Sequence, residues 1–299
     1  MFNRTKISLI VTMLLFGSIG LFVRNIAFSS GQTALARGII GALFLFVAGT
    51  LLRKRIVWGN VRKNLWILIA SGIAIGVNWI FLFEAYKYTT ISNATISYYF
   101  APVFVMAAAP LLLKERPNGI RTLCILAALA GMFLVAGTEK GAFKGRSLIG
   151  IGYGLAAAAF YASVIIMNKF LKDISGLEST LVQLAAASAA LLPYVLVNDG
   201  LSWGGADSRS MVLLLIVGIV HTGLGYLLYF SAMQRLSSQT IAAFSYLDPI
   251  SAVLMSCLFL KEHMSLLQLA GGILILGATY VNERYGAVKS QPGSLDNMG

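Results

Sequence analysis

An acidic residue stands inside a long apolar stretch near the end of the chain. Asp248, with Pro249 directly after it, lies in FSYLDPISAV, and this run stays apolar as far as Lys261. On insertion scales a charged side chain at the centre of a bilayer costs at least ~2.5–3.5 kcal/mol, so its presence calls for a reason. We interpret Asp248 as a proton carrier or as the counter-charge for a substrate amine. The alternative is a structural hydrogen bond that holds a kink at Pro249, whose ring removes one backbone donor.

Three further ionisable side chains lie within apolar runs. His221, in GIVHTGLGYLLYF, would form a proton relay with Asp248 if a helical hairpin brought the two together. A neutral imidazole bonded to a backbone carbonyl is the alternative. Glu84 lies three residues before Lys87, which suits either an ion pair near the membrane surface or an outer gate with a second protonatable group. Arg37 either extends toward the membrane surface or pairs with Glu84.

Aromatic and amide side chains accompany these charges in the same apolar runs. Apolar walls with a few polar groups suit a small organic ligand, and aromatic faces also accept a cation. Packing in the core or at the membrane interface is the alternative for any single member of the set. The candidate cavity residues of this kind are Asn78, Trp79, Tyr99, Tyr161 and Tyr246.

The composition identifies the solvent around these residues. The chain is 58% hydrophobic and 11% charged, with a mean hydropathy of +0.81, whereas soluble domains carry about 25% charged residues. Apolar runs of roughly 20 residues, enough to cross the hydrocarbon core as helices, recur along the whole chain. We predict an all-α integral membrane protein of ten transmembrane helices, the first being an uncleaved N-terminal span. The predicted spans are about 7–26, 32–52, 65–87, 91–113, 118–137, 147–170, 178–198, 210–233, 237–260 and 265–285.

The basic residues sort by side of the predicted membrane. A net charge of +12 would suit nucleic-acid binding, but most of the 23 Lys and Arg residues fall in connections on the side that holds the N-terminus. Because cytoplasmic loops carry such an excess, we predict a multi-pass protein of the cell membrane with both termini in the cytoplasm. We therefore exclude nucleic acid as a partner and expect the lipid bilayer instead. Cys124 and Cys257 lie inside predicted helices, and we interpret them as core residues.

The chain also repeats itself. Two stretches of about 33 residues, beginning at Phe83 and Phe230, match in one unbroken register at a shift of 147 residues. Chance matching of apolar segments would not preserve Tyr, Pro and a Lys-Glu pair together. The matches are Phe83 with Phe230, Ala85 with Ala232, Tyr99 with Tyr246, Pro102 with Pro249, and Lys114-Glu115 with Lys261-Glu262.

The repeat divides the chain into two predicted domains of five spans each, residues 1–142 and 143–285. An odd number of spans makes the second half enter the membrane from the opposite side, which is the inverted repeat of many secondary transporters. Such proteins hold substrate near the midplane, between the halves. Pro102 and Pro249 are expected to kink their helices at equivalent positions. The polar residues 286–299 are expected to form a disordered cytoplasmic tail.

The paired motifs, each an Ala, a Pro and a Lys-Glu at the same spacing, resemble the EamA type of the drug/metabolite transporter superfamily. Arg37 in LARGIIG also fits that family's second span, and the resemblance extends from about Ile7 to Tyr285. It implies a central cavity lined by the first, third, fourth, sixth, eighth and ninth helices. Many members carry a Trp in the first span where this chain has Phe16, which makes Phe16 a further candidate cavity residue.

The repeat and the resemblance together predict a secondary transporter that exports a small organic metabolite, an amino acid or a related compound, by alternating access. Proton coupling is left open, and an uncoupled facilitator or an importer is the nearest alternative. An intramembrane lipid-handling enzyme is the alternative from a different class, but the sequence contains no HExxH motif and only one His inside a predicted span. We therefore predict no catalytic residue, no metal and no cofactor, and a monomer or weak homodimer.

Overall fold

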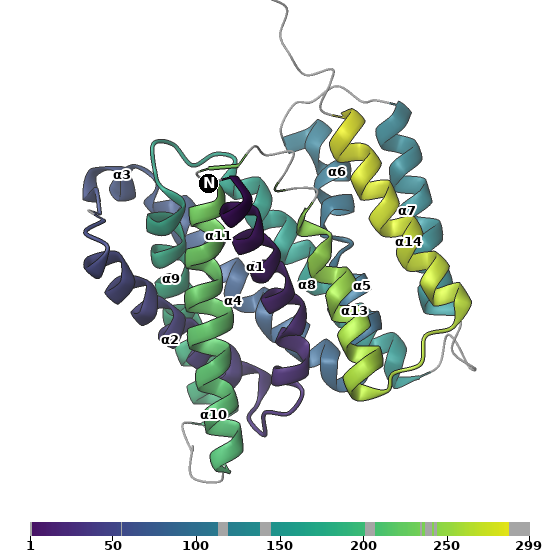
Figure 1. Cartoon of the computed structure of the whole chain (residues 1–299), viewed down its shortest axis with the longest axis horizontal. Coiled ribbons are helices and arrows are strands. Elements are labelled where there is room, and N and C mark those ends of the chain that lie inside the picture. The colour runs from purple at the N-terminus through teal and green to yellow at the C-terminus, as the bar shows by residue number, and fades with distance from the viewer. Residues whose placement is uncertain are drawn as a thin grey trace, which may run out of the picture.

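The computed structural model describes residues 2–54, 56–112, 119–137, 145–200, 207–233, 235–236, 241 and 244–286. The regular elements in these residues are all helical (Figure 1). The predicted tail after Gly286 and the Lys114-Glu115 pair lie outside the described residues. The elements are α1 (Phe2–Val23), α2 (Ser30–Leu51), α3 (Trp58–Lys63), α4 (Leu65–Tyr88), α5 (Ile91–Tyr98), α6 (Ala101–Leu112), α7 (Gly119–Gly137), α8 (Arg146–Asn168), α9 (Gly176–Asn198), α10 (Ser208–Ile216), η1 (Val217–Leu224), α11 (Gly225–Met233), α13 (Leu247–Leu260), α14 (Leu266–Val281) and η2 (Asn282–Gly286).

The helices have the length and composition of membrane spans. Large side chains such as Leu43, Phe46 and Val197 are more than half exposed, which water would disfavour and lipid would not. The described residues hold seven sufficiently long apolar segments: Arg4–Val23, Ser30–Leu51, Leu65–Tyr88, Ile91–Ala108, Arg146–Asn168, Gly176–Asn198 and Ser208–Ala232. The shorter apolar helices are Gly119–Val135, Leu247–Leu260 and Leu266–Val281. The chain is therefore a multi-pass membrane protein, as its composition predicts, while the number of ten spans remains a prediction.

Local sequence signals explain where several helices begin. In α2, α9 and α14 a serine side chain accepts the backbone N–H three residues on, and a Gln or Glu side chain at that position accepts from the serine N–H. This reciprocal capping box satisfies two backbone donors that the helix would otherwise leave unpaired. The three pairs are Ser29 with Gln32, Ser175 with Glu178, and Ser265 with Gln268.

The two repeat prolines lie at the start of helical segments. The predicted span 91–113 is divided, because α5 ends at Tyr98 and α6 begins at Ala101, with Pro102 in its first turn. Pro249 likewise lies in the first turn of α13. Proline suits this position, since its missing N–H would have had no partner within the helix. Tyr99 therefore lies at the joint between α5 and α6.

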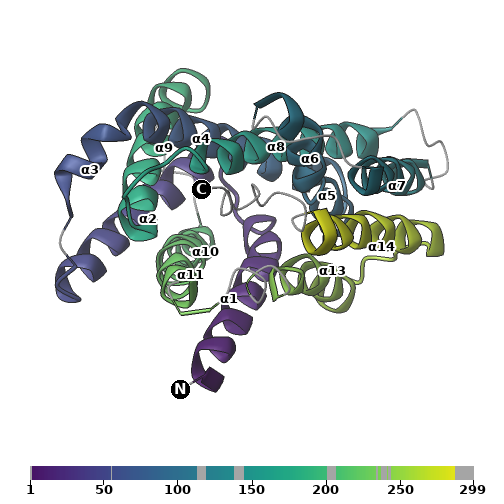
Figure 2. The same cartoon turned by 90° about the horizontal axis from the view of Figure 1, so that it is seen from above.

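Helices that are far apart in sequence pack side by side. Helix α4 packs on α8 and α9, α2 packs on α9 and η1, and α1 packs on α11 and α13. Helix α5 packs on α8 and α13, while α7 packs on α14. Figures 1 and 2 show α7 and α14 together at one end of the molecule and α3 at the other. The helices that carry His221 and Asp248 lie between these ends, while α2, which carries Arg37, lies toward the α3 end (Figure 1).

The contact between α7 and α14 depends on two glycines. A Cβ atom placed on Gly271 would lie 2.5 Å from the Gly131 carbonyl oxygen, and one on Gly131 would lie 2.6 Å from the Gly271 carbonyl oxygen. Both distances are too short for a carbon–oxygen contact, so only glycine allows the two backbones to approach this closely. Small residues commonly make such contacts between membrane helices.

We expect Gly271→Val to destabilise the protein by about 1–3 kcal/mol, because the added side chain must force α7 and α14 apart. The melting temperature of the purified protein in detergent should fall by several degrees. Gly277→Val is the matched control, since a Cβ at Gly277 of the same helix meets no atom within 4 Å. Equal melting temperatures for the two variants would show that this crossing does not hold the helices together.

Candidate functional site

The Asp248 carboxyl group has a hydroxyl donor but no cationic partner among the described residues. The Tyr99 hydroxyl, at the joint between α5 and α6, donates a hydrogen bond to Asp248 Oδ2 in the first turn of α13. Within the described part of the chain, no Lys or Arg forms a salt bridge with Asp248. The carboxyl group therefore remains available to bind a proton or a cation.

Aromatic rings continue from this carboxyl group to α8. The Tyr98 ring lies edge-on to Tyr99 with 5.8 Å between ring centroids, and 5.3 Å from the ring of Tyr161. Tyr161 is 40% exposed, so its face is open to lipid or to a ligand. Of the predicted cavity residues, the structure thus brings Tyr99 and Tyr161 together with Asp248.

Arg37 forms a second, positively charged group. It is only 5% exposed, and its Nε donates a 2.7 Å hydrogen bond to Thr222 Oγ1 in η1. Its guanidinium carbon lies 4.3 Å from the centroid of the Trp79 ring and 5.8 Å from that of Phe83. Aromatic faces stabilise a cation, but they do not neutralise its charge. Among the described residues, no carboxylate lies within salt-bridge distance of Arg37.

The predicted pairing of Arg37 with Glu84 is therefore not formed, nor does Arg37 extend to the membrane surface. Glu84 instead accepts a 3.0 Å hydrogen bond from Lys87 Nζ, which is the alternative that the sequence spacing left open. The physical reason is the direction of Arg37, which extends toward Trp79 and the π-helical segment η1. Its partners come from α4 and η1, and sequence spacing within α2 does not reveal them.

His221 contacts α1 and has no hydrogen bond to Asp248 among the described residues. Its Nε2 lies 3.0 Å from Ser18 Oγ, and its ring centroid lies 4.7 Å from that of Phe22. His221 and Thr222 both belong to the π-helical segment η1, and they contact α1 and α2 respectively. His221 Nδ1 also lies 3.4 Å from the Ile216 carbonyl, which is the alternative that the sequence left open, while a relay to Asp248 remains a prediction.

The other predicted cavity residues make contacts between helices. Asn78 Nδ2 donates a 2.6 Å hydrogen bond to the Ala157 carbonyl, which joins α4 to α8. Phe16 and Tyr226 pack with 5.6 Å between ring centroids. Tyr246 packs against Tyr280 of α14 at 5.8 Å, although its repeat equivalent is the tyrosine that bonds Asp248. The two halves therefore use equivalent tyrosines differently.

Glu262 is a buried polar residue that the sequence interpretation did not select. Its carboxylate accepts hydrogen bonds from the backbone N–H groups of Ile91 and Ser92, at 3.0 and 3.3 Å, and from the Ser92 hydroxyl at 3.2 Å. It also pairs with Arg24 Nη1 at 2.5 Å. One carboxylate thus joins the ends of α1 and α13 to the start of α5. The sequence did offer one indication of its importance, because Glu262 ends the Lys-Glu motif that recurs in both halves.

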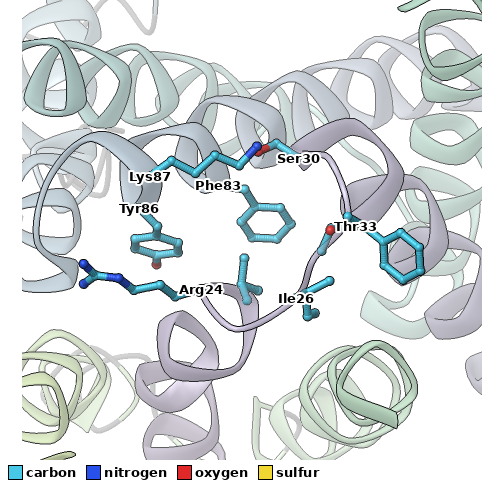
Figure 3. A pocket seen from close by; sticks show the side chains of 9 residues that line it. Arg24, Ile26, Ser30, Thr33, Phe83, Tyr86 and Lys87 are labelled. Atoms are coloured by element: carbon cyan, nitrogen blue, oxygen red, sulfur yellow. The ribbon is translucent and has the colours of Figure 1, made fainter. Parts of the chain in front are cut away.

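A pocket of about 260 Å³ opens beside Arg24. Figure 3 shows Phe83 in the middle of this pocket, with Tyr86 and Arg24 on one side and Thr33 on the other. The Phe83 ring also faces Arg37, with 5.8 Å between its centroid and the guanidinium carbon, and it lies 6.4 Å from the Tyr86 ring. Phe83 therefore lies between the pocket and Arg37. The lining residues are Val23, Arg24, Ile26, Phe28, Ser30, Thr33, Phe83, Tyr86 and Lys87.

At the helix ends that lie away from this pocket, hydrogen bonds link the two halves of the chain. Asn64, which is 4% exposed, donates to the Lys172 carbonyl at 2.8 Å and accepts from the Lys172 N–H at 3.0 Å. Asn60 Nδ2 donates to the Asp173 carbonyl at 2.5 Å, and Glu178 accepts from the Val57 N–H at 2.7 Å. We call this side the Asn64 side, and the side of the pocket the Arg24 side.

Comparison with known proteins gives a family match over most of the chain. The family described as "EamA-like transporter family" matches twice, at residues 4–137 and 148–283. The chain is 26% identical over 275 residues to a Bacillus subtilis protein named "Uncharacterized transporter YxxF", which covers 90% of this chain and 86% of that protein. It is 24% identical to "Protein RarD" of Salmonella typhi, over 81% of each chain.

The fold also resembles that of a solved protein. A crystal structure aligns with 93% of this chain and 96% of its own, with a TM-score of 0.62 and 19% sequence identity. At this level of identity the match shows a shared arrangement of helices and nothing about ligands.

Proposed function

The chain belongs to the EamA-like transporter family, and from this premise we propose that it exports a small organic metabolite by alternating access. The proposed substrate is an amino acid or a related compound, carried across the cell membrane in exchange for protons. The observation that carries the proposal is the Asp248 carboxyl group, which is held by the Tyr99 hydroxyl and has no cationic partner among the described residues. Intramembrane carboxyl groups of this kind commonly mark ion and substrate paths.

Helix packing supports two inverted five-helix repeats, residues 1–142 and 143–285. Exchanging the halves relates α1 to α8, α2 to α9, α4 to the α10–η1–α11 span, α5–α6 to α13, and α7 to α14. The most extensive packings then have equivalents in the other half. The pair α4–α8 corresponds to α1–α11, α4–α9 to α2–η1, and α5–α8 to α1–α13. The pairs α2–α9, α5–α13 and α7–α14 each join equivalent helices, as a two-fold axis in the membrane plane requires.

The distribution of contacts between the two sides supports alternating access. On the Asn64 side, backbone and amide hydrogen bonds connect residues 57–64 of the first half to residues 172–178 of the second. On the Arg24 side lies the pocket that Phe83 helps to line. We assign the Asn64 side to the cytoplasm, which places both termini there, as the distribution of basic residues predicts. The described conformation is then closed to the cytoplasm, with its pocket on the outer side.

The exchange of protons for substrate would follow if both bind to the same Asp248 carboxyl group. In a medium of low dielectric constant, a neutral carboxyl group and an ion-paired carboxylate are both tolerated, whereas a lone carboxylate is costly. Asp248 would therefore change sides either protonated or paired with a substrate ammonium group. Because a proton and an ammonium group cannot occupy it together, outward movement of substrate would be coupled to inward movement of a proton.

The first test is metabolite profiling of the medium from cells that overexpress the wild-type chain or carry an empty vector. We expect one class of amine-bearing metabolite to rise several-fold in the medium with the wild-type protein. Proteoliposomes should then exchange the same compound across the membrane without ATP. A well-inserted wild-type protein that changes no metabolite in either assay would contradict export, and an uptake assay would then decide between import and no transport.

A further inference from the structure

We infer that Arg37 is the residue that binds the carboxylate of the transported compound, while Asp248 binds its ammonium group. The substrate is then a free amino acid that is recognised at both charged ends. This inference rests on the proposed transport function and assigns its substrate class and a residue that determines specificity.

Arg37 is arranged as a binding group that lacks its anion. It is 5% exposed, and no described carboxylate pairs with it. A buried cation that served only stability would usually be paired, because an uncompensated charge away from water is costly. Thr222 Oγ1 accepts from Nε, and Tyr226 lies beside the guanidinium group, whose five N–H donors still exceed these partners. A guanidinium group binds a carboxylate through two parallel hydrogen bonds, and it does so better than a Lys ammonium group.

The neighbours of Arg37 fix its direction. Trp79 lies against the guanidinium group at 4.3 Å, and Thr222 holds Nε at 2.7 Å. Thr222 is itself held, because its hydroxyl donates to the Val217 carbonyl at 3.0 Å within η1. π-Helical turns within longer helices are frequent at functional sites. A planar group that is fixed in this way loses little freedom when a carboxylate binds.

Aromatic side chains of one core cluster connect the two charged groups. Phe83, beside Arg37, packs on Tyr86, while Tyr98, beside the Tyr99 that bonds Asp248, packs against the same cluster. Yet Arg37 and Asp248 form no ion pair with each other. Two opposite charges that border one cluster but do not meet are matched best by a ligand that carries both signs. A simple amine would leave Arg37 unpaired, and a simple acid would leave Asp248 unpaired.

The pocket on the Arg24 side leads toward these groups. Phe83 and Tyr86 line it, and their ring centroids lie 6.4 Å apart. The same Phe83 ring lies 5.8 Å from the Arg37 guanidinium carbon. A rotation of Phe83 would therefore connect Arg37 to the pocket, through which a released amino acid would leave.

The test measures binding to the full-length protein in detergent. The probes are the common L-amino acids, added one at a time, and the intrinsic tryptophan fluorescence and the melting temperature of the protein report binding. For each amino acid that binds, the corresponding amide, which lacks the carboxylate, and the deaminated acid, which lacks the ammonium group, are titrated in parallel. We expect the wild-type protein to bind the amide about 10- to 100-fold more weakly than the amino acid.

Arg37→Gln should remove this preference, so that the amino acid and its amide bind equally weakly. Arg37→Lys keeps the charge and should retain part of the preference, which also covers the case in which Arg37→Gln does not fold. Arg62→Gln is the control, because Arg62 is exposed in α3 and does not line the pocket. Equal binding of amide and amino acid by the wild type, or no binding of any amino acid, would overturn the inference.

Failure of this inference can be told apart from failure of the proposed function. A wild-type protein that exports a compound without a carboxylate, with Arg37→Gln equally active, overturns the role of Arg37 and leaves export intact. A wild-type protein that moves nothing in cells or in proteoliposomes overturns the transport proposal itself.

Discussion

Asp248→Asn should abolish proton-driven transport while the protein remains inserted and folded. An asparagine side chain has nearly the same shape, and its amide oxygen still accepts the Tyr99 hydroxyl hydrogen bond. It binds no proton at physiological pH and offers no charge to a substrate ammonium group. Breaking a buried charge pair typically costs about 3–5 kcal/mol, which corresponds to a loss of affinity of roughly 150- to 4,000-fold.

The measurement uses proteoliposomes with an imposed pH gradient and the compound found by metabolite profiling. Wild-type accumulation should follow the gradient, whereas Asp248→Asn should show no dependence on it. Tyr99→Phe keeps the carboxyl group and should lower the rate only in part. Glu84→Gln is the matched control, because Glu84 pairs with Lys87 and has no contact with Asp248. If Asp248→Asn retained gradient-driven transport, the carboxyl group would be structural and the exchange mechanism would fail.

Glu262→Ala should destabilise the protein by about 2–4 kcal/mol. The side chain of Glu262 is 7% exposed, and its carboxylate accepts from Arg24, from two backbone N–H groups and from one hydroxyl. Removing it leaves the donors of Ile91 and Ser92 without their charged acceptor, and unpaired buried groups each cost about 1–3 kcal/mol. The melting temperature in detergent should fall by roughly 5–10 °C.

Arg24→Ala provides the comparison on the same contact. The Arg24 side chain is 41% exposed, so its loss should cost at most about 1 kcal/mol. Glu84→Ala, which breaks a more exposed pair on the same side of the protein, should lie in the same range. If Glu262→Ala were no more destabilising than these two, the carboxylate would not hold α5 against α1 and α13.

Several features of this protein follow from the order of residues alone. The surrounding solvent follows from composition, since so few charges cannot cover a water-facing surface. Helix positions follow from apolar runs bounded by signals that act over a few residues, such as the serine of a capping box or a proline in the first turn. The internal repeat is visible because Tyr, Pro and Lys-Glu recur at one shift. The family follows from the same motifs, and the sequence comparisons confirm it.

Only the tertiary structure decided the partners of the polar residues. Arg37 meets Thr222, and His221 meets Ser18, across about 200 residues of chain. Such contacts depend on how neighbouring helices are rotated, and the π-helical turn in η1 changes that rotation without a clear sequence signal. In a membrane, lipid accepts any apolar face, so hydrophobic periodicity does not say which face meets protein. Interactions within one helix, such as Glu84 with Lys87, were therefore predictable, whereas the neighbours of each buried charge required the folded chain.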